Sequence, residues 1–230
     1  MNTEGASTPR WVDPQASPGL GIVDRASLFL WVVACVGYFG PWITRRPASA
    51  ALSWNAYDLF ALLRLLPEIE SGAVRVNLQA LQLPSLALAL LLPVLTAHGR
   101  TFLRIGSTLV STALALLTFP PYPEIITAWR TPGWRVPFWW GVGTVVCAWL
   151  AVWAAPRIGK TRHWVCMVVA LITIIPAAAT LSRLLPPLRS LHNAAVGPGW
   201  GFWGCTAGLG VIGLLSMLRA LEVIDGHHPR

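Results

Sequence analysis

The sequence has few charged side chains, and this shortage excludes a water-soluble globular domain. Charged residues make up 11% of the chain and hydrophobic residues 55%, whereas soluble domains carry about 25% charged residues. The net charge of +8 comes from arginines and lysines that stand singly or in pairs between apolar runs. A nucleic-acid site would need them clustered on one face, but this spacing is typical of membrane topology signals and lipid headgroup contacts. We therefore expect the lipid bilayer, and no nucleic acid, as a partner.

Sequence motifs of catalysis and cofactor binding are also missing. The chain contains no GxSxG nucleophile motif, no HExxH metal motif and no GxxxxGK phosphate-binding loop. Its four cysteines lie in different apolar runs and form no CxxC pair, which indicates buried free thiols rather than a zinc or redox site. Chemistry inside a membrane needs ionisable side chains. The six apolar runs between charged residues, at 26–44, 76–97, 105–123, 136–156, 164–182 and 193–218, contain no Asp, Glu, Lys, Arg or His. We expect no catalytic residues, no metal and no cofactor.

Long apolar runs dominate what is present. The stretch from Val136 to Pro156 carries no charged residue, and about 20 uncharged residues suffice for one helix to cross a bilayer. The sequence therefore predicts an all-α integral membrane protein, a bundle of about six transmembrane helices with amphipathic helical segments in the outer connections. The predicted spans are residues 26–44, 78–97, 103–121, 136–155, 164–182 and 200–219. The second contains Pro84 and Pro93, so a count of four or five helices remains the alternative.

The connections between the runs predict the orientation of the chain. Residues 98–104 and 157–163 form short connections with basic and no acidic residues, as in cytoplasmic loops. Arg45 and Arg46 lie in an opposite connection and count against this orientation. We expect a multi-pass protein of the cell membrane with both termini in the cytoplasm. Its predicted parts are a flexible tail at residues 1–25, a single membrane domain at 26–222 and a short polar tail at 223–230.

The first outer connection has the pattern of an amphipathic helix. Its leucines recur at the i, i+3, i+4, i+7 spacing of one helix face, and Asn55 is placed to cap the first turn. The predicted surface helix comprises Asp58, Leu59, Leu62, Leu63, Arg64, Leu66 and Glu68. Such a helix lies flat at a membrane surface, and a docking face for a partner or a lid over a cavity are the alternatives.

The motif Pro-Gly-Trp occurs at residues 132–134 and again at 198–200, each time before an aromatic-rich helix start. Tryptophan is enriched where a helix enters the membrane interface. The predicted interfacial anchors are Trp134, Trp139, Trp140, Trp200 and Trp203. The recurrence indicates either a duplicated hairpin or the ordinary chemistry of an interfacial helix start.

Small and hydroxyl side chains recur within the predicted helices. Gly204 and Gly208 form a GxxxG pair, and Ser107, Ser111 and Ala115 follow one another at the same four-residue spacing. Small residues allow close helix packing, either within the bundle or against another subunit. Hydroxyl groups that could line a polar cavity are those of Thr108, Ser111, Thr112, Thr118, Thr144 and Thr173.

These features favour a non-catalytic membrane subunit of a transport system that needs a separate energy-coupling partner, such as an ATPase. In size and expected topology, but in no motif, the chain resembles permease subunits of ATP-driven exporters. The alternative is a structural or assembly subunit of a larger membrane complex, of the respiratory or another electron-transfer type. A polar cavity between the helices would favour transport, whereas hydroxyl groups bonded to backbone carbonyls in a packed bundle would disfavour transport through this chain alone.

Overall fold

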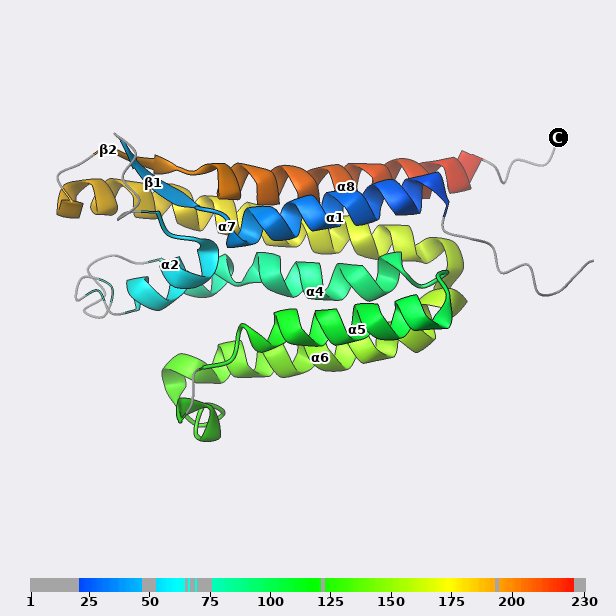
Figure 1. The fold of residues 1–230 in the computed structure, drawn as a ribbon, viewed down its shortest axis with the longest axis horizontal. Coiled ribbons are helices and arrows are strands. Elements are labelled where there is room, and N and C mark those ends of the chain that lie inside the picture. The colour runs from blue at the N-terminus through cyan, green and yellow to red at the C-terminus, as the bar shows by residue number, and fades with distance from the viewer. Residues whose placement is uncertain are drawn as a thin grey trace, which may run out of the picture.

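The computed structural model describes residues 21–46, 53–64, 66, 69, 76–120, 123–192 and 195–225. In this part of the chain it is mostly helical, which confirms the predicted fold class in its main feature (Figure 1). The α-helices are α1 (Ile22–Phe39), α2 (Ala56–Leu63), α4 (Leu83–Leu95), α5 (Thr101–Leu116), α6 (Pro132–Ile158), α7 (Arg162–His192) and α8 (Trp200–Asp225). The 3₁₀ helices within these described residues are η2 (Leu78–Leu81), η3 (Glu124–Ile126) and η4 (Gly159–Thr161).

Four of the helices, α1, α6, α7 and α8, are long and apolar enough to cross a membrane. Helices α4 and α5 have 13 and 16 residues. At about 1.5 Å per residue they are about 20 and 24 Å long, whereas the hydrocarbon core of a bilayer is about 30 Å thick. The four long helices suggest a membrane-embedded protein, as predicted, but helix length does not establish six crossings.

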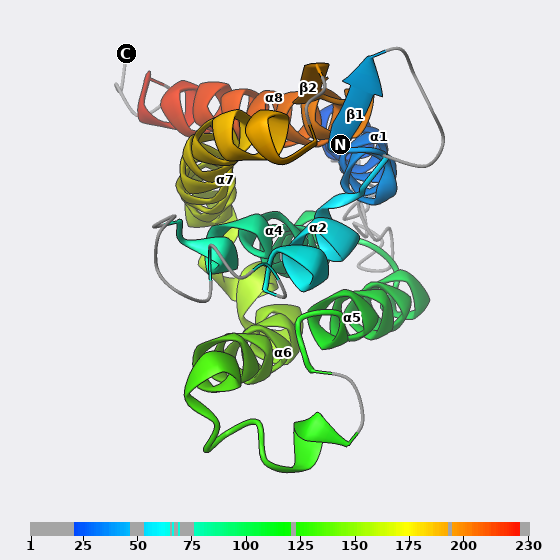
Figure 2. The same ribbon diagram turned by 90° about the vertical axis from the view of Figure 1, so that its left-hand side faces the viewer.

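Helix α4 occupies the centre of the bundle. Figure 1 and Figure 2 show α1, α7 and α8 on one side of it and α5 and α6 on the other. Nearly all residues of α4 are buried between these neighbours, and the indole N–H of Trp31 on α1 donates to the Leu88 carbonyl over 2.8 Å. A helix that is apolar all round suits a position with neighbours on every side. Apolar side chains therefore fill the axis of the bundle.

Small residues bring α1 and α8 into close contact. Gly208 of α8 faces α1, and a Cβ atom added there would lie 2.8 Å from the Cβ of Ala34. Gly204 lies one turn earlier, against Gly37. The structure thus places the GxxxG pair inside the bundle, where close approach of two helices gains packing contacts.

A two-stranded antiparallel sheet corrects the expectation of helices and loops alone. Strand β1 (Ile43–Arg46) pairs with β2 (Ala195–Pro198), with Ile43 opposite Pro198. Residues 40–44 were predicted as the end of the first span, but α1 ends at Phe39. Pro41 follows Gly40, and a proline disfavours helical backbone in the residue before it. The β-branched Ile43 and Thr44 then favour a strand.

Helix α7 is longer than its predicted span at residues 164–182, because it continues through Pro186 and Pro187. Each proline removes one backbone hydrogen bond of the helix. Leu184 and Leu188, which are four residues apart, are buried in the core. These core contacts hold the last turns of α7 against the bundle and offset the lost hydrogen bonds.

The two ends of the bundle carry different elements. The sheet end carries the sheet, α2 and η3, whereas the terminal end carries the start of α1, the turn between α4 and α5, η4 and the last turns of α8 (Figure 1). The first and last described helices thus have their outer ends on the same side of the bundle. Helix α8 runs to Asp225, three residues into the predicted polar tail. Residues 1–20 and 226–230, the rest of the predicted tails, lie outside the described residues.

Candidate functional site

A cavity of about 410 Å³ lies at the sheet end of the bundle, beneath α2. Its walls come from α2, the start of α4, the residues after α5, η3 and the start of α6. Most lining side chains are aromatic or apolar, and they include four polar groups: a guanidinium, an amide, a carboxylate and a phenolic hydroxyl. The lining residues are Tyr57, Phe60, Ala61, Arg64, Gln82, Leu117, Phe119, Glu124 and Trp134. We call this site the α2 cavity.

Helix α2 begins as the sequence predicts, but its apolar face is rotated from the predicted one. The backbone N–H of Asp58 donates to Oδ1 of Asn55 over 2.8 Å, which confirms the predicted cap. Leu59 and Leu63 are buried, and so is Phe60. Leu62, predicted in the same stripe, is 40% exposed. Phe60, and not Leu62, therefore completes the buried face of α2, and Phe60 also lines the cavity.

The rest of the predicted surface helix is placed as follows. Asp58 is exposed, Leu66 is half-buried against the core, and Glu68 lies outside the described residues. The buried face of α2 contacts α1 and η2, which are parts of the same chain. Of the three expected roles, this contact fits a lid over a cavity, because the apolar face is covered by protein.

Arg64 is the central polar group of the α2 cavity. Its Cζ atom lies 3.7 Å from the centroid of the Trp134 ring and 5.5 Å from that of Phe60. Its Nη1 atom is buried without a hydrogen-bond partner. Burial lowers the pKa of Arg64, and the charge of Glu124 partly opposes this shift. Gly133 leaves room for the guanidinium, because a Cβ atom there would lie 2.7 Å from Nη2 of Arg64.

Arg64 also lines a second cavity of about 300 Å³, together with Asn77, Gln79 and Gly133. Its guanidinium is therefore accessible to a ligand although one of its nitrogen atoms is buried.

The sequence assigned Arg64 to a polar helix face and Trp134 to the membrane interface, and their contact was not foreseen. The sequence did contain one indication that Glu124 has a functional role, because it is the one acidic residue between positions 117 and 135.

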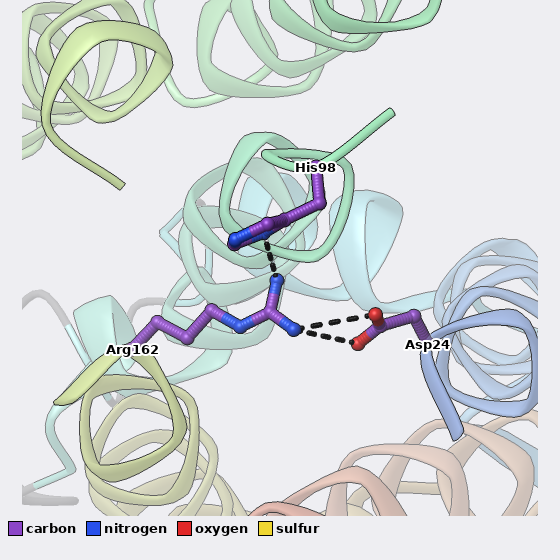
Figure 3. Close-up of polar contacts among 3 residues, drawn as sticks. All are labelled: Asp24, His98 and Arg162. Carbon is purple, nitrogen blue, oxygen red and sulfur yellow. Dashed lines mark hydrogen bonds and ion pairs between the residues drawn. The ribbon is translucent and has the colours of Figure 1, made fainter. Parts of the chain in front are cut away.

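A second polar cluster lies at the terminal end. Figure 3 shows the guanidinium of Arg162 between His98 and Asp24. Its Nη1 atom lies 2.6 Å from Nδ1 of His98, and Nη2 lies 3.2 Å from both carboxylate oxygens of Asp24. A guanidinium can only donate hydrogen bonds, so Nδ1 of His98 accepts and the ring is neutral. Burial and the charge of Arg162 lower the pKa of His98. The cluster joins α1, the α4–α5 turn and α7.

The hydroxyl groups expected to line a polar cavity are mostly bonded to their own helices. Each of four threonines donates to a backbone carbonyl three or four residues earlier, over 2.8–2.9 Å. These donors are Thr108, Thr112, Thr118 and Thr173. Thr144 is buried, and Ser111 differs, because its buried Oγ atom has no partner. Helix packing therefore accounts for these hydroxyls, and they do not line the α2 cavity.

The small residues of α5 also face the interior. Ser107, Ser111 and Ala115 are buried. The hydroxyl of Thr96, just after α4, donates to Oγ of Ser107 over 2.7 Å, and Ser107 donates to the carbonyl of Arg104. This face of α5 thus packs within the bundle, as the Gly204 and Gly208 face of α8 does.

The predicted interfacial tryptophans divide into two groups. Trp134 is half-buried and stacks on Arg64. The others are exposed: Trp139 by 53%, Trp140 by 39%, Trp200 by 58% and Trp203 by 59%. Exposed tryptophans near a helix start fit the predicted interfacial role, but a stacked Trp134 has a role in the cavity that the sequence did not reveal.

The described residues contain no group of three or more His, Cys, Asp or Glu side chains that could hold a metal ion. The four cysteines are free thiols. Comparisons of the chain with protein-family models, with curated proteins and with solved structures find no match.

Proposed function

We propose that the chain is a non-catalytic subunit of a larger membrane complex, with a structural or assembly role. The observation that carries this proposal is the position of α4, which fills the bundle axis with buried leucine, alanine and proline side chains. A transport path along that axis would need polar or water-filled space. The threonine hydroxyls that could have lined it donate to backbone carbonyls instead. These contacts favour the structural role over transport through this chain alone.

The proposal includes six membrane crossings in the cell membrane. Helix α5 would cross together with its flanking turns, and α4 together with η2. An even number is supported by the start of α1 and the end of α8, which lie at the same end of the bundle (Figure 1). That end carries Arg100 and Arg162, and the positive-inside rule assigns basic connections to the cytoplasm. Both termini would then be cytoplasmic.

The exposed face of α6 is the surface that we assign to a partner subunit. Gly143 lies at the centre of this face, and no atom of another element lies within 4 Å of where its Cβ atom would be. A glycine inside a helix costs about 1 kcal/mol relative to alanine. Close approach of a second helix would use the open space and offset this cost.

A deep tryptophan on the exposed side of α6 also supports a partner at this helix. Trp149 is 47% exposed and lies four residues from the midpoint of α6, or about 6 Å along the axis. Tryptophan prefers the membrane interface over the hydrocarbon centre. An exposed indole near the middle of a spanning helix is better explained by contact with another protein.

Cross-linking from Cys147 tests this proposal. Cys147 is exposed one turn after Gly143, and a variant with the other three cysteines changed to alanine would carry a thiol-reactive benzophenone at this position. The matched control places the probe at Ile172→Cys in a chain without other cysteines, because Ile172 is 61% exposed on α7 at a similar depth. We expect a protein adduct of defined mass from position 147 in native membranes, and none from 172. Lipid adducts alone from both positions would refute the proposal.

A transport subunit with a separate energy-coupling partner is the second candidate function. The α2 cavity favours it, because a cavity that contains Arg64 and Glu124 could receive a solute at the sheet end. The cross-linked partner would distinguish the two functions. A partner with a GxxxxGK loop and ATP hydrolysis would support transport, and a partner without nucleotide binding would support the structural role.

A further inference from the structure

We propose that the α2 cavity binds a small zwitterionic ligand, whose carboxylate or phosphate contacts Arg64 and whose ammonium group contacts Glu124. This proposal concerns the sheet end of the bundle and does not depend on the partner assigned to α6. It rests on three features of the cavity: an arginine with an unused donor, a carboxylate that lines the same cavity and an aromatic lining of suitable size.

Arg64 is prepared to bind an oxyanion. Its buried Nη1 atom has no hydrogen-bond partner in the structure, and an unsatisfied buried donor is destabilising. The ring of Trp134 covers one face of the guanidinium at 3.7 Å, which fixes its plane and leaves its edge for hydrogen bonding. A planar guanidinium pairs with a carboxylate or phosphate through two parallel hydrogen bonds. An anionic group in the cavity would therefore pair with the guanidinium, and a small shift of the Arg64 side chain would bring the buried Nη1 donor to it.

Glu124 makes a purely anionic ligand unfavourable. Its carboxylate lines the same cavity and is close enough to influence the pKa of Arg64. The two groups nevertheless form no direct ion pair, since the ion pair found among the described residues joins Arg162 and Asp24. A ligand with one negative and one positive group would pair with both. A simple anion would instead be repelled by Glu124.

The remaining wall fits the apolar part of such a ligand. Phe60, Phe119 and Leu117 supply apolar surface, while the amide of Gln82 and the hydroxyl of Tyr57 supply further hydrogen bonds. A volume of about 410 Å³ lies in the range of pockets that bind small molecules. Two sources offer this chemistry: a free amino acid with an apolar side chain, or the headgroup of phosphatidylethanolamine from the surrounding bilayer.

The first arm of the test uses free ligands and the purified full-length chain in detergent micelles. Three probes share one phenyl group and differ in charge: L-phenylalanine carries both charges, 3-phenylpropanoate only the negative one and 2-phenylethylamine only the positive one. Binding is measured by equilibrium dialysis. If the source is a free amino acid, we expect L-phenylalanine to bind at least about tenfold more tightly than either analogue, because each lacks one charge-assisted pair.

The second arm uses lipids. The chain is placed in nanodiscs that contain equal amounts of phosphatidylethanolamine and phosphatidylglycerol, and native mass spectrometry measures which lipid stays bound after the disc is removed. Selective retention of phosphatidylethanolamine supports the headgroup source. Failure of both arms, or equal binding of the zwitterion and the simple anion, would overturn the proposal.

Variants assign the effect to the two charges. Arg64→Gln should reduce binding of the zwitterion by at least about tenfold. Arg64→Lys should bind with intermediate affinity, because it retains the charge without the planar fork. Glu124→Gln should reverse the preference, so that 3-phenylpropanoate or phosphatidylglycerol binds better than the zwitterion. An unchanged preference in Glu124→Gln would overturn the role of that carboxylate.

Arg130→Gln is the matched control. Arg130 is an exposed arginine in the connection between α5 and α6, which also carries Glu124. It stacks on Trp129 at 3.9 Å, but it does not line the α2 cavity. Its loss should leave binding unchanged. An equal loss of binding in Arg130→Gln and Arg64→Gln would indicate a general effect of surface charge and would contradict the proposal.

Discussion

The guanidinium of Arg64 stacks on the indole of Trp134, with the Cζ atom 3.7 Å from the ring centroid. This contact ties the end of α2 to the start of α6 and so closes one wall of the α2 cavity. A stacked pair of this kind contributes about 0.5–2 kcal/mol, depending on how far it is removed from water.

Trp134→Leu should therefore lower the free energy of unfolding by about 1–2 kcal/mol, because it removes the aromatic face under Arg64. Unfolding in mixed micelles, followed by circular dichroism, measures this loss. Trp139→Leu is the control, since Trp139 is 53% exposed and should change the value by less than about 0.5 kcal/mol. Equal losses in both variants would show that the Arg64 contact contributes no stability.

The contact between α1 and α8 predicts a difference between two glycines of one helix. Gly208→Ala would place a Cβ atom 2.8 Å from that of Ala34, whereas Gly210 has open space at the same position. We expect Gly208→Ala to destabilise the fold by about 1–3 kcal/mol, as overpacked sites do. Gly210→Ala should be neutral or slightly stabilising. The unfolding midpoints of the two variants measure the difference, and a stable Gly208→Ala would contradict the close helix contact.

The pKa of His98 predicts how stability depends on pH. The folded-state pKa lies below the usual value of about 6.5, so the folded chain binds fewer protons than the unfolded chain as the pH falls. The contribution of His98 to the free energy of unfolding is therefore complete above about pH 6.5. It is lost as the pH falls toward the lowered folded-state pKa. Thermal unfolding across this range should show lower midpoints at the acidic end.

His98→Asn separates this effect from others. The charged groups that interact with His98 are Asp24 of α1, Arg104 of α5 and Arg162 of α7. His163 of α7 also interacts with His98, and its pKa is lowered as well, mainly by burial. An asparagine oxygen in place of His98 could still accept from Arg162 without titrating. The variant should therefore reduce the slope of stability against pH while retaining the fold. A slope equal to that of the unmodified chain would exclude His98 as its source.

The ion pair between Asp24 and Arg162 predicts a measurable cost when it is broken. The two side chains are 15% and 13% exposed, so the pair lies between a surface pair and a buried one. Asp24→Asn should lower the free energy of unfolding by about 1–3 kcal/mol. Asp58→Asn, at an exposed position of α2, is the charge-matched control and should have little effect. Calorimetry of both variants checks the prediction.

The elements that the sequence predicts well are local ones. Apolar runs of spanning length predict α1, α6, α7 and α8, because length and composition decide this property. The cap at Asn55 is confirmed for the same reason, since it depends on residues three positions apart.

Contacts between distant segments could not be predicted in the same way. The partners of Arg64 and Arg162 depend on how whole helices pack, and no local pattern specifies them. The sheet joins segments before α2 and after α7, so its short strands have no local signal beyond β-branched residues such as Ile43. The buried face of α2 was predicted from the spacing of the leucines alone, and Phe60 was left out of it. The contact of Phe60 with Arg64 depends on the tertiary structure and has no local sequence signal.

The most direct test of the proposed subunit role measures the cross-link from Cys147 when the space at Gly143 is filled. Gly143→Leu would occupy the open space on α6, whereas Gly106→Leu fills a similarly open site on α5. We predict that Gly143→Leu abolishes the protein adduct in native membranes and that Gly106→Leu retains it. An adduct of unchanged yield in Gly143→Leu would contradict a partner helix at this face.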